Sequence, residues 1–263
     1  MTHQNDTSGV GSPKIEQKRV ALVTGANQGI GFQAAKELAV NGFFVYVGSR
    51  DFEKGKIAAE KIGPNARPLQ LDVTDKASVA AASETIRTVY SSLDLLVNNA
   101  AISHAGKPGR TLEEIISDGR ASIASVDEVR AIFETNVFGV IAVTQAMLPL
   151  LKESPSGRIV NVTSSVGSLT LNSNPDNPYR SVFSIGYGAS KTALNAITLA
   201  FSIELEATNI KVYAASPGFT ATALNNFQGT ETLEEGARNV VRAALDENDS
   251  TTIFTGPDGP YPW

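Results

Sequence analysis

The sequence predicts an α/β fold, in which a doubly wound parallel sheet of about seven strands carries helices on both faces. Short apolar runs alternate with helix-like segments from Val20 onward, and this alternation implies right-handed βαβ units. The runs are almost continuously apolar, as expected of strands that are buried on both faces. A length of 263 residues with 42% hydrophobic residues supplies enough apolar material for one such domain.

Each strand is predicted from a short apolar run, and each helix from apolar residues spaced three or four apart. The first helix is expected to stop at Gly42, because glycine favours helix C-termini. The predicted strands are Val20–Val23, Phe43–Val47, Pro68–Val73, Leu93–Val97, Arg158–Val162, Ile210–Ala214 and Ile253–Phe254. The predicted helices are Ile30–Val40, a charged segment that ends at Ile62, Lys76–Tyr90, Val126–Leu151, Tyr187–Ala207 and Leu233–Leu245.

Three longer segments interrupt this alternation, and each of them follows a predicted strand. Ser103–Ser125 is polar with several glycines, Leu169–Ser184 is rich in Asn, Ser and Pro, and Phe219–Thr232 is small and polar. In an open parallel sheet, the loops that follow the strands line the ligand crevice. We therefore expect these three segments to shape a substrate site.

Composition excludes several classes of function. A formal net charge of -5 argues against non-specific binding to nucleic acid or to anionic membranes, which attract basic proteins. The chain has no cysteine, and its two histidines, His3 and His104, are far apart in sequence; we therefore expect no bound metal. No apolar run is expected to span a membrane, and the start of the chain lacks a secretory signal, so we predict a cytoplasmic protein.

A glycine-rich turn, Thr24–Gly31, joins the first predicted strand to the first predicted helix. Gly25 allows a tight turn, Gly29 lets a ligand approach the backbone, and Gly31 lets the helix pack closely on the sheet. Main-chain amides and the helix dipole then favour phosphate groups. The turn in this position predicts a Rossmann-type domain that binds a dinucleotide. We expect one dinucleotide-binding and catalytic domain over residues 19–263, after a polar, flexible extension over residues 1–18. The predicted cofactor residues of the turn are Gly25, Asn27, Gln28, Gly29, Ile30 and Gly31.

The spacing of these glycines resembles the classical short-chain dehydrogenase/reductase family, and the resemblance continues to the C-terminus. It implies that Asp72 binds the adenine edge of the cofactor and that Asn98 steadies the central sheet. Ala101 stands where the family usually has glycine. The loop Pro217–Thr222 resembles the family loop beside the nicotinamide amide. The further cofactor residues implied are Asp72, Val73, Asn99, Ala100, Pro217, Gly218, Thr220 and Thr222.

Arg50 follows the second apolar run and bears on the choice of cofactor. An acidic group at this strand end binds a ribose 2′-hydroxyl, whereas an arginine suits a 2′-phosphate. Arg50 therefore favours NADP(H) over NAD(H). The alternatives stay open, because Asp51 takes the other role if the strand ends one residue later, and Arg50 can be a solvated surface residue.

Tyr187 and Lys191 are four residues apart in a predicted helix and therefore lie on one face. A positive charge beside a phenol lowers its pKa from about 10 toward neutrality, which makes Tyr187 a usable proton donor and acceptor. The resemblance implies that Ser164, with Ser165 as the adjacent candidate, orients a carbonyl oxygen. It also implies that Asn136 holds a water in a proton relay. The implied catalytic residues are Asn136, Ser164, Tyr187 and Lys191, and the last two also contact the cofactor.

The reaction implied is reversible hydride transfer that reduces a ketone or aldehyde with NADPH, on a small-molecule substrate. Tyr187 follows Ser164 by 23 residues, and this long spacing resembles the carbonyl-reductase-like members of the family. The alternatives are an NAD-dependent alcohol dehydrogenase, an epimerase or dehydratase on the same scaffold, and a catalytically silent NADP(H) sensor. The family's habit of pairing predicts a homodimer or homotetramer, whereas an insertion before the tyrosine helix can give a monomer.

Overall fold

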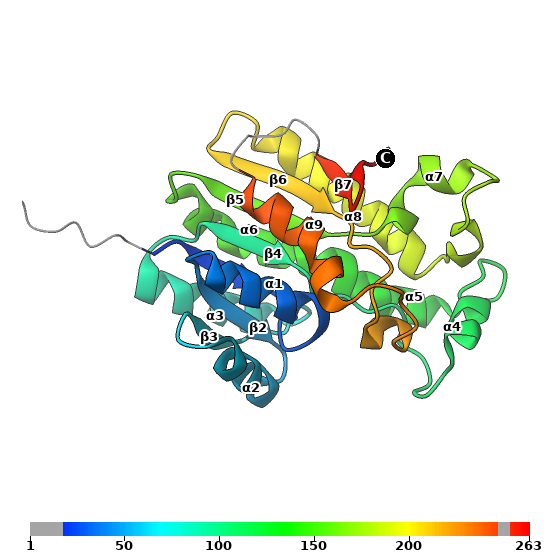
Figure 1. The fold of residues 1–263 in the computed structure, drawn as a ribbon, viewed down its shortest axis with the longest axis horizontal. Coiled ribbons are helices and arrows are strands. Elements are labelled where there is room, and N and C mark those ends of the chain that lie inside the picture. Colours follow the sequence, from blue (N-terminus) through cyan, green and yellow to red (C-terminus); the bar gives the residue numbers. More distant parts are fainter. Residues whose placement is uncertain (1–17, 247–252) are drawn as a thin grey trace, which may run out of the picture.

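A computed structural model describes residues 18–246 and 253–263, and Figure 1 shows its fold. The described residues form one sheet in the order β3-β2-β1-β4-β5-β6-β7-β8. Neighbouring strands are parallel except β7 and β8, which confirms the predicted doubly wound fold. The strands are β1 Val20–Val23, β2 Phe44–Ser49, β3 Ala66–Gln70, β4 Leu95–Asn98, β5 Gly157–Val162, β6 Ile210–Ala215, β7 Phe254–Gly256 and β8 Gly259–Pro260.

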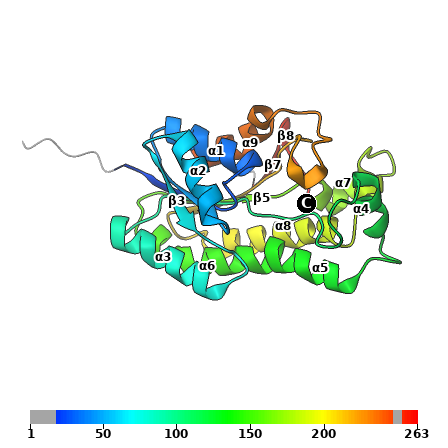
Figure 2. The same ribbon diagram turned by 90° about the horizontal axis from the view of Figure 1, so that it is seen from below.

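Helices cover both faces of the sheet, with α1, α2 and α9 on one face and α3, α6 and α8 on the other (Figure 2). Successive strand residues face opposite layers: Ala21 and Val23 belong to one core cluster, Val20 and Leu22 to the other. This double burial explains why the strands are almost continuously apolar. The helices are α1 Gly29–Val40, α2 Phe52–Ile62, α3 Lys76–Tyr90, α4 Leu112–Asp118, α5 Val126–Phe133, α6 Gly139–Lys152, α7 Leu169–Ser173, α8 Tyr187–Glu204 and α9 Leu233–Leu245.

Several predicted boundaries are wrong. The predicted strand Pro68–Val73 begins and ends too late, since β3 spans Ala66–Gln70. The strand cannot continue to Val73, because Asp72 accepts a hydrogen bond from the Thr74 amide (2.9 Å) and turns the chain out of the sheet. The last helix residue of α8 is Glu204, so the predicted helix Tyr187–Ala207 ends too late. The sheet has an eighth strand, β8, which turns back antiparallel at Gly259. The expected extension over residues 1–18 lies outside the described residues except for Lys18.

The predicted helix Val126–Leu151 is not uniform. A π-helical turn, Glu134–Phe138, separates α5 from α6. By length and composition, the stretch Val126–Lys152 is apolar enough to cross a membrane, so the prediction that no run is long and apolar enough is wrong. The residues of α6 that face the sheet, among them Val143 and Met147, are fully buried in the core. Packing on the sheet thus accounts for the apolar character of that face.

The buried tyrosine of β2 gives a first test of this core. Tyr46 is fully buried beside the rings of Phe44 and Tyr90, and its hydroxyl has no hydrogen-bond partner within residues 18–246 and 253–263. Tyr46→Phe removes this unsatisfied group and is expected to raise the free energy of unfolding by about 1 kcal/mol. Urea denaturation measures the change. A loss of stability of similar size would show that the hydroxyl is satisfied, for example by a buried water.

Candidate active site

A cavity of about 650 Å³ opens where the loops that follow β1, β4, β5 and β6 meet. Such a crevice at the carboxyl ends of parallel strands is where open α/β sheets bind ligands. It brings together part of the predicted site: Ile30, Asn99, Ser164, Tyr187, Lys191, Pro217, Gly218, Thr220 and Thr222. The other predicted residues do not line this cavity: Gly25, Asn27, Gln28, Gly29, Gly31, Arg50, Asp72, Val73, Ala100 and Asn136.

The turn between β1 and α1 has the geometry that a phosphate-binding turn needs. Gly25 and Gly29 have φ angles of 63° and 61°, in the left-handed region that favours glycine. A Cβ on Gly31 would lie 2.7 Å from the Gly25 carbonyl oxygen and closer still to the Asn99 amide. Helix α1 has no side-chain cap and no acidic residue in its first turn. Its N-terminus therefore fits an anionic group such as a dinucleotide phosphate.

Thr24 and Asn99 hold this turn against the end of β4. The Thr24 hydroxyl accepts hydrogen bonds from the Asn99 and Ala100 amides, at 2.9 and 3.0 Å. The Asn99 side-chain amide donates to the Thr24 and Gly25 carbonyls, at 2.9 and 3.1 Å. The side chain of Asn99 is thus bound to the turn. Asn99, which was predicted to contact the cofactor, supports the turn that would hold it.

The central sheet is tied together by asparagines. Asn98 donates to the Asn161 side-chain oxygen (2.8 Å) and to the Thr144 hydroxyl (3.1 Å), and Asn161 donates to Thr198 (2.9 Å). These buried bonds link β4, β5, α6 and α8. Asn98 therefore occupies the steadying position that the resemblance implies.

The end of β2 separates the two candidate residues for cofactor choice. The strand ends at Ser49, so Arg50 is the first residue after it, and the residue is exposed. Asp51 is the N-cap of α2, where its carboxylate accepts from the Lys54 amide (3.1 Å) and lies 3.5 Å from the Lys54 ammonium. The Asp51 carboxylate is therefore engaged in capping.

Close packing brings three of the four predicted catalytic residues, Ser164, Tyr187 and Lys191, together at the wall of the cavity. Ser164 follows β5 and begins a short 3₁₀ turn, where its hydroxyl accepts from the Val166 amide (3.3 Å). The next glycine, Gly167, lies against the backbone of Lys191, so that a Cβ there would approach the Lys191 carbonyl carbon to 2.8 Å. This contact presses the Ser164 turn onto α8, whose first residue is Tyr187.

The pKa of Tyr187 differs from the expectation. Burial raises the pKa of Tyr187 to about 12, against a smaller lowering by its hydrogen bond with Ser164. Burial also lowers the pKa of Lys191 to about 7. The Lys191 ammonium donates to the Val162 carbonyl (2.8 Å) and lies 5.6 Å from the centre of the Tyr187 ring. The pKa of Tyr187 is therefore raised in this structure, and not lowered toward neutrality as predicted, because burial outweighs the hydrogen bond with Ser164.

Asn136 lies in the π-helical turn between α5 and α6 and is buried. Its side chain exchanges two hydrogen bonds with the backbone of Ile102, both 2.9 Å, and donates to the Ser190 hydroxyl (3.0 Å). Ser190 in turn donates to the Tyr187 carbonyl (2.7 Å). Widened helical turns often occur at functional sites, and this one connects the loop after β4 with the start of α8.

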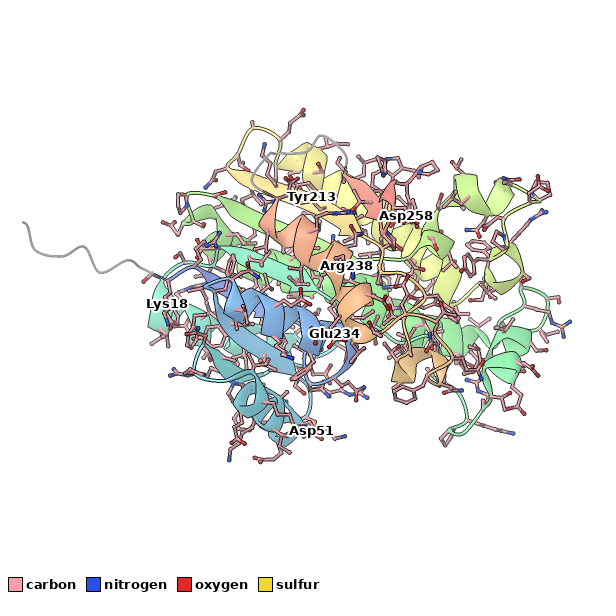
Figure 3. All side chains as sticks on the ribbon, viewed as in Figure 1. Lys18, Asp51, Tyr213, Glu234, Arg238 and Asp258 are labelled. Carbon is pink, nitrogen blue, oxygen red and sulfur yellow. The ribbon has the colours of Figure 1, made fainter. Side chains whose placement is uncertain are left out.

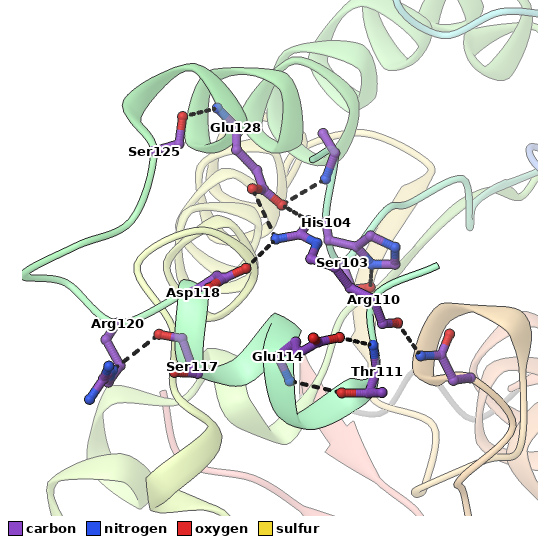
Figure 4. A network of polar contacts seen from close by, with 12 residues as sticks. Ser103, His104, Arg110, Thr111, Glu114, Ser117, Asp118, Arg120, Ser125 and Glu128 are labelled. Atoms are coloured by element: carbon purple, nitrogen blue, oxygen red, sulfur yellow. Dashed lines mark hydrogen bonds and ion pairs between the residues drawn. The ribbon is translucent and has the colours of Figure 1, made fainter. Parts of the chain in front are cut away.

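The loop after β4 is more ordered than its polar sequence suggests. It contains α4, whose Thr111 and Glu114 form a capping box; this Thr-x-x-Glu pattern was the signal that could have predicted the helix. Figure 4 shows Arg110 between two carboxylates, with 2.5 Å to Glu128 and 3.0 Å to Asp118. The pair with Glu128 holds the loop to α5, and the pair with Asp118 ties Arg110 to the end of α4. The apolar wall that follows consists of Leu112, Ile115, Ile116, Val129 and Ile132.

All three segments that were expected to shape a substrate site contribute lining residues, whereas sequence reasoning missed the lining residues near the C-terminus. Tyr179 and Val182 come from the segment before α8, Glu231 precedes α9, and Asp258 and Tyr261 flank β8. None of these belongs to a motif, and only the fold brings them together. Among the described residues, no group of three or more potential ligands could hold a metal ion.

Comparison with known proteins places this geometry in a family context. Residues 19–232 match the family model for short chain dehydrogenases. A short-chain dehydrogenase of Penicillium roqueforti, anuI, is 37% identical over 238 residues, which cover 87% of this chain and 89% of that protein. The structure of salutaridine reductase from Papaver somniferum superposes with a TM-score of 0.75 and 30% identity, over 90% of this chain and 99% of that one. A 3-ketoacyl-(acyl-carrier-protein) reductase from Brucella melitensis, solved with NADH, gives 0.73 and 26%, over 90% and 94%.

Proposed function

The chain belongs to the short-chain dehydrogenase family, and we propose that it reduces a ketone or aldehyde to an alcohol with NADPH. Membership makes it an oxidoreductase that uses a nicotinamide cofactor and acts on a small molecule. The observation that carries the proposal is the placement of Ser164, Tyr187 and Lys191 on the wall of one cavity. The cofactor, when bound, supplies the hydride that reduces the carbonyl carbon.

The side chains of this wall have complementary roles in the proposed reaction. The Ser164 hydroxyl donates a hydrogen bond to the carbonyl oxygen and stabilises the negative charge that develops there. The Tyr187 hydroxyl gives its proton to that oxygen and completes the alcohol. With a pKa of about 12, the phenol is protonated at neutral pH. This state suits a proton donor, whereas the reverse oxidation needs the phenolate.

The remaining residues would hold the cofactor. The turn at Gly25, Gly29 and Gly31 fits its phosphates, and the Pro217–Thr222 loop lies at the wall of the same cavity. Lys191, buried beside Tyr187, is proposed to bind the nicotinamide ribose. Its pKa of about 7 leaves a fraction of the amine uncharged at neutral pH, and a bound hydroxyl group would favour the ammonium.

Arg50 supports NADPH over NADH as the cofactor. It directly follows β2 and is exposed, while Asp51 is occupied with capping. Arg50→Ala is expected to lower kcat/KM for NADPH by about 10- to 100-fold, because it removes a charged hydrogen bond to the 2′-phosphate. Steady-state kinetics with both cofactors on one good carbonyl substrate measures this.

Lys54→Ala is the matched control for Arg50→Ala, since it removes another exposed cation close by. Its ratio of kcat/KM for NADPH to that for NADH is expected to stay near the wild-type ratio. A wild-type enzyme that prefers NADH would contradict the assignment of Arg50 and favour an NAD-dependent alcohol dehydrogenase. Tight NADPH binding without oxidation on a panel of aryl ketones, aldehydes, diketones and steroids would favour the sensor.

A further inference from the structure

Glu231 is an unpartnered carboxylate in the wall of the cavity. It lies between the loop after β6 and α9, where its backbone amide donates to the Phe219 carbonyl (3.0 Å). Its carboxyl group packs against Gly218, so closely that a Cβ on Gly218 would overlap it. The Oε2 atom is buried and has no hydrogen-bond partner among the described residues. A carboxylate without a partner in such a position is costly.

The charges around Glu231 make this cost larger. Burial, Glu235 and Asp258 raise the pKa of Glu231, and Arg238 opposes them. Figure 3 labels Asp258 beside β7 and Arg238 on α9. Arg238 is exposed, and among the described residues Glu231 forms no ion pair within 4 Å.

The described charged residues of the whole cavity also leave Glu231 without a positive partner. Among its described lining residues, the acidic ones are Asp118, Glu128, Glu231 and Asp258, and the basic one is Lys191. Asp118 and Glu128 share the guanidinium of Arg110, which offsets one of their two charges. Lys191 is directed to the Val162 carbonyl, at the Tyr187 side. Glu231 and Asp258, in contrast, form no ion pair within 4 Å among the described residues.

Aromatic rings line the same cavity as these two carboxylates. Tyr179 and Phe219 have ring centres 6.4 Å apart, and they remain 47% and 38% exposed. Tyr261 also lines the cavity, and the charges of Asp258 and Glu231 act on its phenol. Aromatic faces beside a carboxylate are the usual elements of a site for an organic ammonium group. An ammonium there would give Glu231 its missing partner and relieve the repulsion from Asp258.

We propose that Glu231, with Asp258 and the rings of Tyr179, Phe219 and Tyr261, forms a subsite for a positively charged amine on the carbonyl substrate. This inference rests on the proposed carbonyl reduction. It adds a substrate class, namely apolar ketones or aldehydes that carry a protonated amine. The apolar wall of α4 and α5 would take the hydrocarbon part of such a substrate. Glu231 is a specificity residue in this arrangement and takes no part in proton transfer.

A matched pair of ketones tests the subsite. One is an aryl ketone that bears a cyclohexyl group, and the other carries a piperidinium ring in its place, so that the two differ by one charge. Wild-type protein with NADPH is expected to favour the piperidinium ketone. Glu231→Gln is expected to lower the ratio of kcat/KM, charged over neutral, by about 10- to 100-fold. Glu234→Gln is the control: it removes a nearby exposed charge from the first turn of α9 and should leave the ratio unchanged.

Binding distinguishes this inference from the proposed function. The piperidinium and cyclohexyl compounds without the carbonyl group are titrated into the NADPH-saturated protein by calorimetry, with wild type and Glu231→Gln. A preference for the cation that Glu231→Gln removes supports the subsite even if no ketone is reduced, in which case the proposed reaction alone fails. The subsite is overturned if Glu231→Gln leaves the ratio of the two dissociation constants, charged over neutral, unchanged. It is also overturned if the variant binds the charged and the neutral compound more weakly by the same factor. Thermal melting shows that the variant is folded.

Discussion

Tyr187→Phe lowers kcat for carbonyl reduction by about 10²- to 10⁴-fold, the usual contribution of a positioned proton donor, while the dissociation constant for NADPH changes little. The ring remains in place and keeps its packing beside Lys191, whose ammonium lies 5.6 Å from the ring centre. Only the hydroxyl that interacts with Ser164 is lost. Single-turnover oxidation of NADPH measures the chemical step, and fluorescence titration measures cofactor binding.

Tyr46→Phe provides the control for this experiment. It makes the same chemical change at a buried tyrosine of β2 that does not line the cavity, so kcat should be unaffected. If Tyr187→Phe retained close to full activity, the proposed roles of Tyr187, Lys191 and Ser164 would all be wrong. The proton would then have to come from another group in the cavity.

Gly31→Ala is expected to weaken NADPH binding by about tenfold or more and to destabilise the protein by about 1–3 kcal/mol. The new methyl group would meet the Gly25 carbonyl oxygen at 2.7 Å and the Asn99 side-chain amide more closely. That amide is held by two hydrogen bonds to the turn, so neither neighbour can withdraw freely. The turn must deform, and the deformation falls on the part of the chain that would hold the phosphates.

Gly42→Ala separates this effect from backbone strain at a glycine. Gly42 follows the other end of α1 with a φ of 87°, and a Cβ there meets no atom within 4 Å. Alanine costs about 1–2 kcal/mol in such a conformation, but NADPH affinity should stay at the wild-type value. Equal affinity in Gly31→Ala and wild type would show that the turn tolerates the methyl group and does not set cofactor binding.

The sheet and its connections were predictable because their causes are local in sequence. Strands buried on both faces must be apolar at nearly every position. The turn is visible in the sequence because its conformation and close packing require glycine at positions such as Gly25 and Gly31. Strand ends were less accurate, since the departure of the chain at Asp72 depends on one side-chain hydrogen bond. The π-helical turn at Glu134–Phe138 has no sequence period of its own.

On the substrate side of the cavity, the sequence predicted three of the contributing segments but not the individual side chains or their arrangement. Glu231, Tyr179 and Asp258 come from three separate segments, and their proximity depends on how α7, α9 and β8 pack. The pKa of Tyr187 likewise depends on burial, which spacing along a helix does not reveal. Sequence spacing identified which groups face each other. The protonation states of these groups depend on how far each one is buried from solvent, which only the structure shows.

The bonds of Asn136 have a consequence for how this protein can diversify. Asn136 joins Ile102, at the root of the loop that carries α4, to Ser190, which bonds the backbone of Tyr187. The cavity wall formed by the α4 loop and the helix α8, which begins at Tyr187, are therefore connected through the hydrogen bonds of one residue, Asn136. A displacement of the wall that moved Ile102 would therefore act on the backbone of Tyr187 through these bonds. We expect changes of specificity in this wall to alter the turnover rate as well.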